Sequence, residues 1–526
     1  MKLAAALRAR FTLTRILVAI VLVAAFLAVV SLVQGGGASR SDHAAALVPP
    51  DALVYAHLTV DRSSDQWRYA RRIAGNSAVL SALVKQAVAA LHTGGSPSQL
   101  DAALRPWLGD EAALALLPNG RKATSLILLK VRDLRRAKSF LAGVGGSRIS
   151  LYRGTQVRLY GRLATAFAGG FLAVGTPDNV HRALDAQAGR SLVDDQLFRQ
   201  ARAGVDARGS LLYAYAPADG VRRLLQQQRG LVGRIGDLLA RPAARATAAA
   251  ARFERKGIRV WLSDVEFPRL RGAALPAPVF APELPRSVPH NAVAYYGVVG
   301  LTRLFRRLET LSGGRASALS RGIARLRRQL RPSGIRLLAR ALSPLNRREA
   351  ALVVTPPDDA PVISLIVGDT TRDEAGAILL GLQPLLSRVT RTTRGGAAST
   401  LIQGSEAGID TLTLRLGPEL SLTYGALEDR IIVSTDPAGI RQIATAQNTI
   451  LAEPSFAPGM RPLLRAATSV LFLDLHRLSS LVERAGFGTT PEYRAIKPEL
   501  GKIGAVSVIT QSERGSQTTQ AFIEVP

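Results

Sequence analysis

Six histidines are the residues of this sequence best suited to bind a metal or transfer a proton, and they are scattered along it: His43, His57, His92, His181, His290 and His476. No two of them have the four-residue spacing of a helical zinc site, and the H-E-x-x-H motif is absent. The chain has no cysteine, so a metal site would need carboxylates brought together by folding. Local spacing therefore predicts neither a metal site nor a cofactor.

Two of the histidines fall in apolar surroundings. His57 lies in a strand-like stretch with Tyr55 and Leu58, and His476 follows Asp474 at the end of another strand-like stretch. A lone histidine in such a pattern belongs to no ligand motif. We expect both to be packed or hydrogen-bonded core residues.

Motifs for other chemistries are also missing. The glycine-rich run Gly143–Gly146 lacks the Lys-Ser/Thr of a phosphate-binding loop, and no G-x-S-x-G nucleophile elbow occurs. The carboxylate pair Asp194-Asp195 is expected to cap a helix that leads to Phe198, and Asp358-Asp359 to form a turn. No catalytic residue is assigned, and the sequence leans against an enzyme.

The most distinctive surface feature is a basic amphipathic segment. Its apolar face is Leu319, Ile323, Leu326 and Leu330, and its arginines are Arg321, Arg325, Arg327, Arg328 and Arg331. Such a helix can lie on an anionic membrane surface. It can equally pack on a core, a reading favoured here because the apolar face has no Trp or Phe. The five arginines are the candidate contact with an anionic surface.

The whole chain is basic, with a net charge of +29 from 68 basic and 39 acidic residues. Almost all of the basic residues are arginines, which is typical of a GC-rich genome. The alternative is attraction to an anionic partner, such as lipid headgroups or cell-wall polymers. An exterior location disfavours nucleic acid, and no protein partner can be identified.

The N-terminus predicts a single-pass membrane protein. Residues Ile16–Val33 are apolar except for Ser31 and would span about 27 Å as a helix, which is close to the thickness of a bilayer core. The basic residues before them predict a cytoplasmic tail over 1–15, an anchor over 16–34 and a flexible tether over 35–47. The competing interpretation is a cleaved signal peptide, and both place the rest outside a bacterial plasma membrane.

The remainder of the chain is duplicated. Four segments recur in the same order: those that begin at Val48 and Val288, at Glu111 and Glu349, at Phe171 and Ile431, and at Ser210 and Ser469. We therefore expect a first repeat over 48–275 and a second over 288–526. The proline-dense residues 276–287 are expected to form an extended linker.

Each repeat is expected to mix strands and helices. Residues 411–416 alternate apolar and polar side chains, and residues 420–424 continue that pattern after a turn, which predicts a hairpin. Pro177 and Pro437 fit the first turns of helices. The predicted fold class is α+β: two tandem homologous domains after one N-terminal transmembrane helix, each a mainly antiparallel sheet with covering helices.

The opening Val48-Pro49-Pro50-Asp51-Ala52-Leu53-Val54-Tyr55, after an anchor, resembles the DUF3352 family of bacterial proteins of unknown function. The turn Gly175-Thr176-Pro177-Asp178 before a helix adds to the resemblance. It would cover essentially everything from Val48 onward, although the second repeat has Asn291 where the first has Asp51. It implies no catalytic residues.

Three functions are compatible with these observations. The first is a noncatalytic, membrane-anchored binding or scaffold module of the cell envelope, which the duplication and the absence of catalytic motifs favour. The second is a structural spacer in the envelope. The third is an exported hydrolase acting on envelope material, which would need acids that converge from distant loops.

Overall fold

The computed structural model describes residues 42–59, 64–75, 106–120, 122–143, 147–205, 210–220, 244–266, 277–305, 340, 342–356, 361–391, 401–415, 421–456, 466–484, 494, 497, 501–513 and 516–525. The chain forms two compact units: one contains the described residues up to 266 together with Glu513–Ala521, and the other contains the described residues from Ala277 to Ser512 together with 522–525. We call the described residues up to 266 the first repeat, and those from Ala277 to Glu513 the second repeat.

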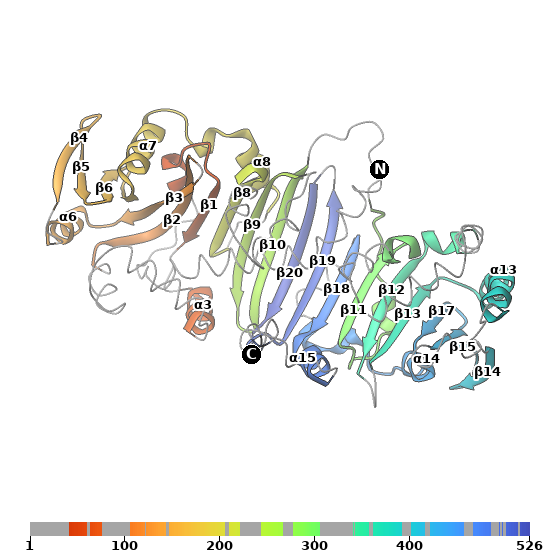
Figure 1. The fold of residues 1–526 in the computed structure, drawn as a ribbon. Coiled ribbons are helices and arrows are strands. Elements are labelled where there is room, and N and C mark those ends of the chain that lie inside the picture. Colours follow the sequence, from red (N-terminus) through yellow and green to blue (C-terminus); the bar gives the residue numbers. More distant parts are fainter. Residues whose placement is uncertain are drawn as a thin grey trace. The chain divides into compact units, whose positions relative to one another are not determined.

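The first repeat is a sheet with short helices on it (Figure 1). Its strands are β1 (Val54–Thr59), β2 (Leu108–Asn119), β3 (Lys122–Val131), β4 (Arg148–Tyr152), β5 (Thr155–Tyr160), β6 (Leu163–Ala168), β7 (Phe171–Gly175), β8 (Leu212–Pro217), β9 (Ala244–Glu254) and β10 (Gly257–Glu266). Its helices are η1 (Ala44–Leu47), α3 (Asp65–Gly75), α6 (Leu134–Gly143), α7 (Pro177–Ala188), η2 (Leu192–Asp194) and α8 (Gln196–Ala203), where η marks a 3-10 helix.

The second repeat has its strands in the same chain order as the first, with helices that differ in part. Its strands are β11 (Ala294–Val299), β12 (Glu349–Thr355), β13 (Val362–Gly368), β14 (Leu401–Glu406), β15 (Ile409–Arg415), β16 (Ser421–Ala426), β17 (Arg430–Ser434), β18 (Ser469–Asp474) and β19 (Ala505–Glu513), and β20 (Ser516–Glu524) ends the chain. Its helices are η3 (Leu284–Ser287), η4 (Ser343–Arg347), α13 (Arg372–Arg391), α14 (Pro437–Ala444), η5 (Ile450–Ala452), η6 (Pro454–Phe456) and α15 (Leu475–Arg484).

Strand pairing follows one pattern in both repeats. In the first, the strand order is β9-β8-β1-β2-β3-β7-β6-β5-β4, and each neighbouring pair is antiparallel. In the second, the order is β19-β18-β11-β12-β13-β17-β16-β15-β14, again antiparallel throughout. Tyr55 and Tyr295 lie on β1 and β11, and Glu111 and Glu349 on β2 and β12. The internal duplication read from the sequence thus corresponds to a duplicated topology.

Helix α7 packs on the sheet of the first repeat, and its counterpart α14 packs on the sheet of the second. Both helices begin at the residues predicted from the sequence. Pro177 and Pro437 occupy the first turns, where a missing N–H costs nothing. Thr176 and Asp436 cap them by accepting backbone N–H groups with their side chains. Asp195 caps α8 by accepting the N–H of Phe198 at 2.7 Å, so the predicted role of the Asp194-Asp195 pair is confirmed.

Each repeat has its own hydrophobic core. In the first repeat Phe198 of α8 contacts three tyrosines edge-on, with ring centroids 5.9 Å from Tyr55, 6.0 Å from Tyr213 and 5.1 Å from Tyr215. In the second repeat Phe456 of η6 packs on Phe472 at 5.6 Å. These rings fasten the short helices to the central strands, which carry the polar residues described below.

The fold-class prediction is wrong about the sheet. All of the named strands belong to one 20-stranded open sheet rather than to two separate sheets, although the antiparallel pairing is confirmed. Alternating side chains identify strands and their faces, but they do not encode which backbone edges pair. The fold-class prediction also included an N-terminal transmembrane helix. Its residues, 16–34, lie outside the described residues. Among those described, no helix combines the length and apolar character needed to cross a bilayer.

The two segments predicted to be irregular contain ordered turns. Within the predicted tether over 35–47, residues Ala44–Leu47 form η1, and Ala44, Ala45 and Leu47 are buried. Within the predicted linker over 276–287, Phe280 bridges to Ala467, and residues Leu284–Ser287 form η3. Each repeat therefore begins several residues before the motif that marks it in the sequence.

Candidate functional site

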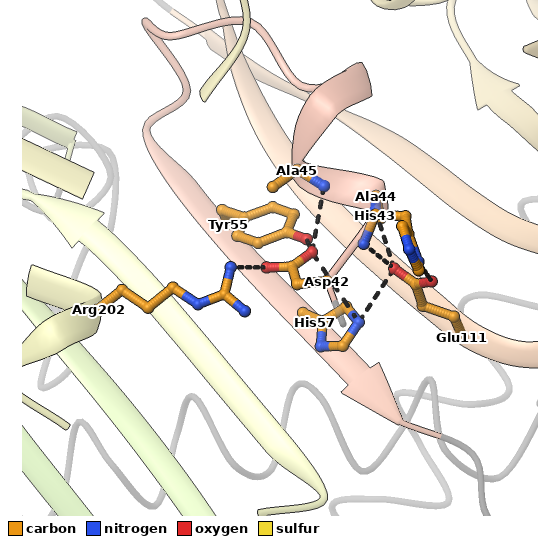
Figure 2. Close-up of polar contacts among 8 residues, drawn as sticks. All are labelled: Asp42, His43, Ala44, Ala45, Tyr55, His57, Glu111 and Arg202. Atoms are coloured by element: carbon orange, nitrogen blue, oxygen red, sulfur yellow. Dashed lines mark hydrogen bonds and ion pairs between the residues drawn. The ribbon is translucent and has the colours of Figure 1, made fainter. Parts of the chain in front are cut away.

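A buried polar cluster lies where the first repeat begins (Figure 2). It joins residues 42–45, which we call the entering segment, to β1, β2 and α8. Its residues are Asp42, His43, Tyr55, His57, Glu111 and Arg202. The side chains of Asp42 and Glu111 are only 2% and 1% exposed. Two carboxylates this deeply buried need close partners, because an unpaired charge away from water is strongly destabilising.

Strand register explains how these side chains meet. Tyr55 and His57 are two residues apart on β1, so they point to the same face of the sheet. In the pairing with β2, His57 lies opposite Ala113, and Glu111 is the next residue on that face. In the pairing with β8, His57 lies opposite Tyr213. The small side chain at position 113 leaves room for His57 to turn toward Glu111.

Glu111 holds the entering segment through its carboxylate. Oε1 accepts the backbone N–H groups of His43 at 2.7 Å and Ala44 at 2.8 Å, and Oε2 lies 3.1 Å from Nδ1 of His43. These are the first amides of the 3-10 turn η1, which have no partner within that turn. One buried glutamate therefore ties the start of η1 to β2.

Asp42 ties the same segment to two other elements. Its Oδ1 accepts the hydroxyl of Tyr55 at 2.5 Å and the backbone N–H of Ala45 at 3.2 Å. Its Oδ2 accepts a guanidinium N–H of Arg202, which extends from α8 toward it at 3.2 Å (Figure 2). Arg202 also lies over the ring of Tyr213, 5.6 Å from its centroid.

His57 lies between the two carboxylates. Its Nε2 is 3.2 Å from Oε1 of Glu111 and 3.9 Å from Oδ1 of Asp42. The expectation that His57 is a buried, hydrogen-bonded residue is confirmed. The imidazole of His57 is thus close to both acids.

The electrostatics of Glu111 reflect these partners. Burial alone would raise its pKa, but the hydrogen bond and charge of His57, the amide of Ala44 and the ring of His43 together lower the pKa below its ordinary value. Tyr55 has a pKa well above its ordinary value because it is buried and because it donates to the carboxylate of Asp42. The arrangement therefore favours a charged Glu111 beside a neutral Tyr55.

The second repeat reproduces the glutamate and the tyrosine of the cluster, but not its histidines or its aspartate. Glu349 accepts the backbone N–H groups of Glu283 at 2.8 Å and Leu284 at 3.3 Å, and the hydroxyl of Tyr295 at 3.4 Å. The position of His57 is taken by Gly297, and Pro282 stands before Glu283 as Asp42 stands before His43. Without histidines, burial dominates and raises the pKa of Glu349 to about 7, although its backbone hydrogen bonds oppose this.

The cluster has the composition of a metal site. One donor atom each from Asp42, His57 and Glu111 lies within 4.8 Å of the others. Imidazole and carboxylate donors are ligands of zinc and of related divalent ions. The same atoms also form a hydrogen-bonded network, which needs no ion to hold the entering segment.

Several other residues singled out in the sequence are either outside the described residues or differently placed than expected. The five arginines Arg321, Arg325, Arg327, Arg328 and Arg331 lie outside the described residues, as do Asp358 and Asp359. His476 is exposed on α15, so the expectation that it belongs to the core is wrong. It follows the strand β18 rather than lying within it, and the helix turns its side chain outward.

Three members of the cluster were missed by sequence reasoning: Asp42, Glu111 and Arg202. Asp42 lies in a segment without strand or helix periodicity, and Glu111 served only as a marker of the duplication. His43 and Glu111 are 68 positions apart, so no local spacing connects them. The available signal was the repeat itself, because Glu111 and Glu349 recur in front of Ala-Ala-Leu in both halves.

Comparisons with known proteins give a family but no activity. No curated protein matches the chain. Crystal forms III and I of TP0453 show 11% sequence identity each, with TM-scores of 0.28 and 0.27. The matches cover 44% and 45% of this chain, and 84% and 81% of the TP0453 chains. The profile of a family described as "Protein of unknown function (DUF3352)" matches residues 15–525, nearly the whole sequence, and the chain therefore belongs to the DUF3352 family.

Proposed function

We propose that this protein is a noncatalytic binding or scaffold module of the cell envelope, tethered to the outer side of the plasma membrane by its N-terminal segment. One observation carries the proposal: the buried cluster holds residues 42–44, the first described residues and part of the predicted tether, against the core of the first repeat. The apolar run Ile16–Val33 and its basic flank support the location.

These hydrogen bonds suit a tethered protein because they are buried and involve several elements of the fold. Residues 42–45 are held by β2 through Glu111, and by β1 and α8 through Asp42. Ala44 and Ala45 are fully buried, and Leu47 is 2% exposed. Tension on the tether would therefore be resisted by the sheet rather than by a loosely attached end.

The same contacts favour holding a chain segment over catalysis. The oxygens of Asp42 and Glu111 already accept N–H and O–H groups of the protein itself. In the second repeat Glu349 performs the same holding function on η3, where the surrounding residues differ. A feature that recurs in both repeats with different neighbours is more readily explained by structure than by a reaction.

For a partner we propose an anionic surface, namely lipid headgroups or cell-wall polymers. The net charge of +29 supports this, and so does the outermost strand β4. Arg148, Ile149 and Leu151 are exposed on β4, and Leu151 is 74% exposed. An edge strand with an exposed arginine and exposed apolar side chains suits the boundary between headgroups and acyl chains.

Thiol labelling tests the location. The natural chain has no cysteine, so single cysteines at Ala5, Gln156 and Ser405 report on one position each. Gln156 and Ser405 are exposed on β5 and β14. In intact cells with a permeable outer envelope, a membrane-impermeant thiol reagent should label the two exposed positions and leave Ala5→Cys unlabelled until the cells are lysed. Labelling of Ala5→Cys alone would overturn the proposed orientation.

A further inference from the structure

We propose that Asp42, His57 and Glu111 bind a divalent transition-metal ion of the zinc class. The proposed function of the cluster requires only its hydrogen bonds, so the ion is an addition to that function. The inference does not depend on where the chain is located.

The separations of the donor atoms suit a single ion. Nε2 of His57 lies 3.2 Å from Oε1 of Glu111 and 3.9 Å from Oδ1 of Asp42, and all three atoms are within 4.8 Å of one another. Zinc binds nitrogen and oxygen at roughly 2.0–2.2 Å, which places neighbouring ligands of a tetrahedral site about 3.4 Å apart. An ion among these atoms would therefore need only small shifts of the side chains.

The charges and outer hydrogen bonds also suit a cation. Two carboxylates face His57. Arg202 donates to Oδ2 of Asp42, whereas Oδ1, which accepts the Tyr55 hydroxyl and the Ala45 amide, lies 3.9 Å from the imidazole nitrogen. His43 contacts Oε2 of Glu111 and the backbone amides contact Oε1. Hydrogen bonds of this kind hold metal ligands in position in known sites.

A second observation points independently to a missing partner. Tyr213 lies opposite His57 on β8 and is 4% exposed, yet its hydroxyl has no hydrogen-bond partner among the described residues. The contact of its ring with Arg202 places it next to the cluster. A buried hydroxyl without a partner is unfavourable. A water molecule on the open position of a three-ligand metal site would supply a hydrogen-bond partner for this hydroxyl.

The second repeat shows that the fold does not require these donors. It keeps the glutamate as Glu349 but has Gly297 at the position of His57, and Val470 lies opposite Gly297 where Tyr213 lies opposite His57. A Cβ at Gly297 would lie 2.4 Å from the hydroxyl of Tyr295, so this repeat has no space for an imidazole. The aspartate, the histidine and the tyrosine hydroxyl are therefore specific to the first repeat.

The test uses the full chain, purified without a polyhistidine tag and stripped of metal by a chelator. Titration calorimetry should show one Zn²⁺ per chain in the wild type. Binding should be weakened by roughly a hundredfold or more in His57→Gly and in Asp42→Asn. Glu349→Gln, the matched variant in the second repeat, should bind Zn²⁺ like the wild type. Tetrahedral Co²⁺ absorption bands in the wild type provide a readout that does not depend on any variant folding.

Failure to bind Zn²⁺, Co²⁺ or Mn²⁺ in the wild type would overturn the metal site. So would wild-type affinity in both His57→Gly and Asp42→Asn, because the ion would then lie elsewhere on the chain. Neither result would affect the proposed function, which is tested by thiol labelling and by amide exchange in metal-free protein.

Discussion

Glu111 and Glu349 hold the same backbone feature in the two repeats: each accepts the amides that open the 3-10 turn in front of the first strand. Their surroundings differ in one respect that matters for charge. Glu111 has His57 and His43 beside it, whereas Glu349 has Tyr295 and no histidine. The pKa of Glu111 is consequently lowered and that of Glu349 is raised to about 7.

The raised pKa of Glu349 predicts that the second repeat loses stability as the pH rises. A carboxyl that binds its proton more tightly in the folded state stabilises that state fully below its unfolded pKa of about 4.5, and the contribution is lost as the pH rises through about 7. The loss should be on the order of 3 kcal/mol. Calorimetric unfolding of the full chain between pH 4.5 and 8 measures it.

Glu349→Gln is the control for that pH dependence, because glutamine resembles the neutral carboxyl. The stability of the variant relative to the wild type should increase between pH 5 and pH 8. A constant difference across this range would show that Glu349 does not titrate there.

Tyr213→Phe is predicted to leave the metal-free protein equally stable or to stabilise it by up to about 1 kcal/mol. The substitution removes a buried hydroxyl without a partner among the described residues, at a position where the second repeat has Val470, which also lacks a hydroxyl. Tyr55→Phe is the matched comparison, since it removes the donor to Asp42 and should cost roughly 1–3 kcal/mol. Chemical denaturation gives both values, and a large loss for Tyr213→Phe would show that its hydroxyl is satisfied.

Two glycine substitutions in the second repeat should change the stability of the protein in opposite directions. Gly297→Ala would place a Cβ 2.4 Å from the hydroxyl and 2.9 Å from Cζ of the buried Tyr295, and should cost about 1–3 kcal/mol. Gly376→Ala, on an exposed face of α13 with nothing within 4 Å of the new Cβ, should stabilise by roughly 0.5–1 kcal/mol. Equal effects in thermal unfolding would contradict the close contact between Gly297 and Tyr295.

Binding to anionic vesicles should depend on salt if the net charge of +29 is functional. Exposed charges are screened within about 8 Å at physiological ionic strength, so binding of residues 41–526 should weaken sharply as salt increases. Arg148→Gln should reduce the binding, and a combined change of Arg321, Arg325 and Arg328 to Gln tests the basic segment. Vesicle flotation with neutral vesicles is the control. Salt-insensitive binding to both kinds of vesicle would contradict the electrostatic proposal.

The elements of this fold were more predictable than the contacts between them. Pro177 after Thr176 and Pro437 after Asp436 are local signals, and the helices begin at those residues. The assignment of all strands to one sheet could not be read from alternating side chains, because pairing is decided between backbones far apart in the sequence. In the candidate site, too, local features were predictable and contacts between distant residues were not. His57 was correctly expected to be buried, but its position between Asp42 and Glu111 results from strand register and from a turn without periodicity.

The central claim is that one buried glutamate fastens the start of each repeat, and amide hydrogen exchange in metal-free full-length protein tests it most directly. Glu111→Ala should accelerate exchange in the peptide that contains His43 and Ala44 and leave the peptide with Glu283 and Leu284 unchanged. Glu349→Ala should do the reverse. If both peptides keep wild-type protection in both variants, the glutamates do not hold these segments and the account is wrong.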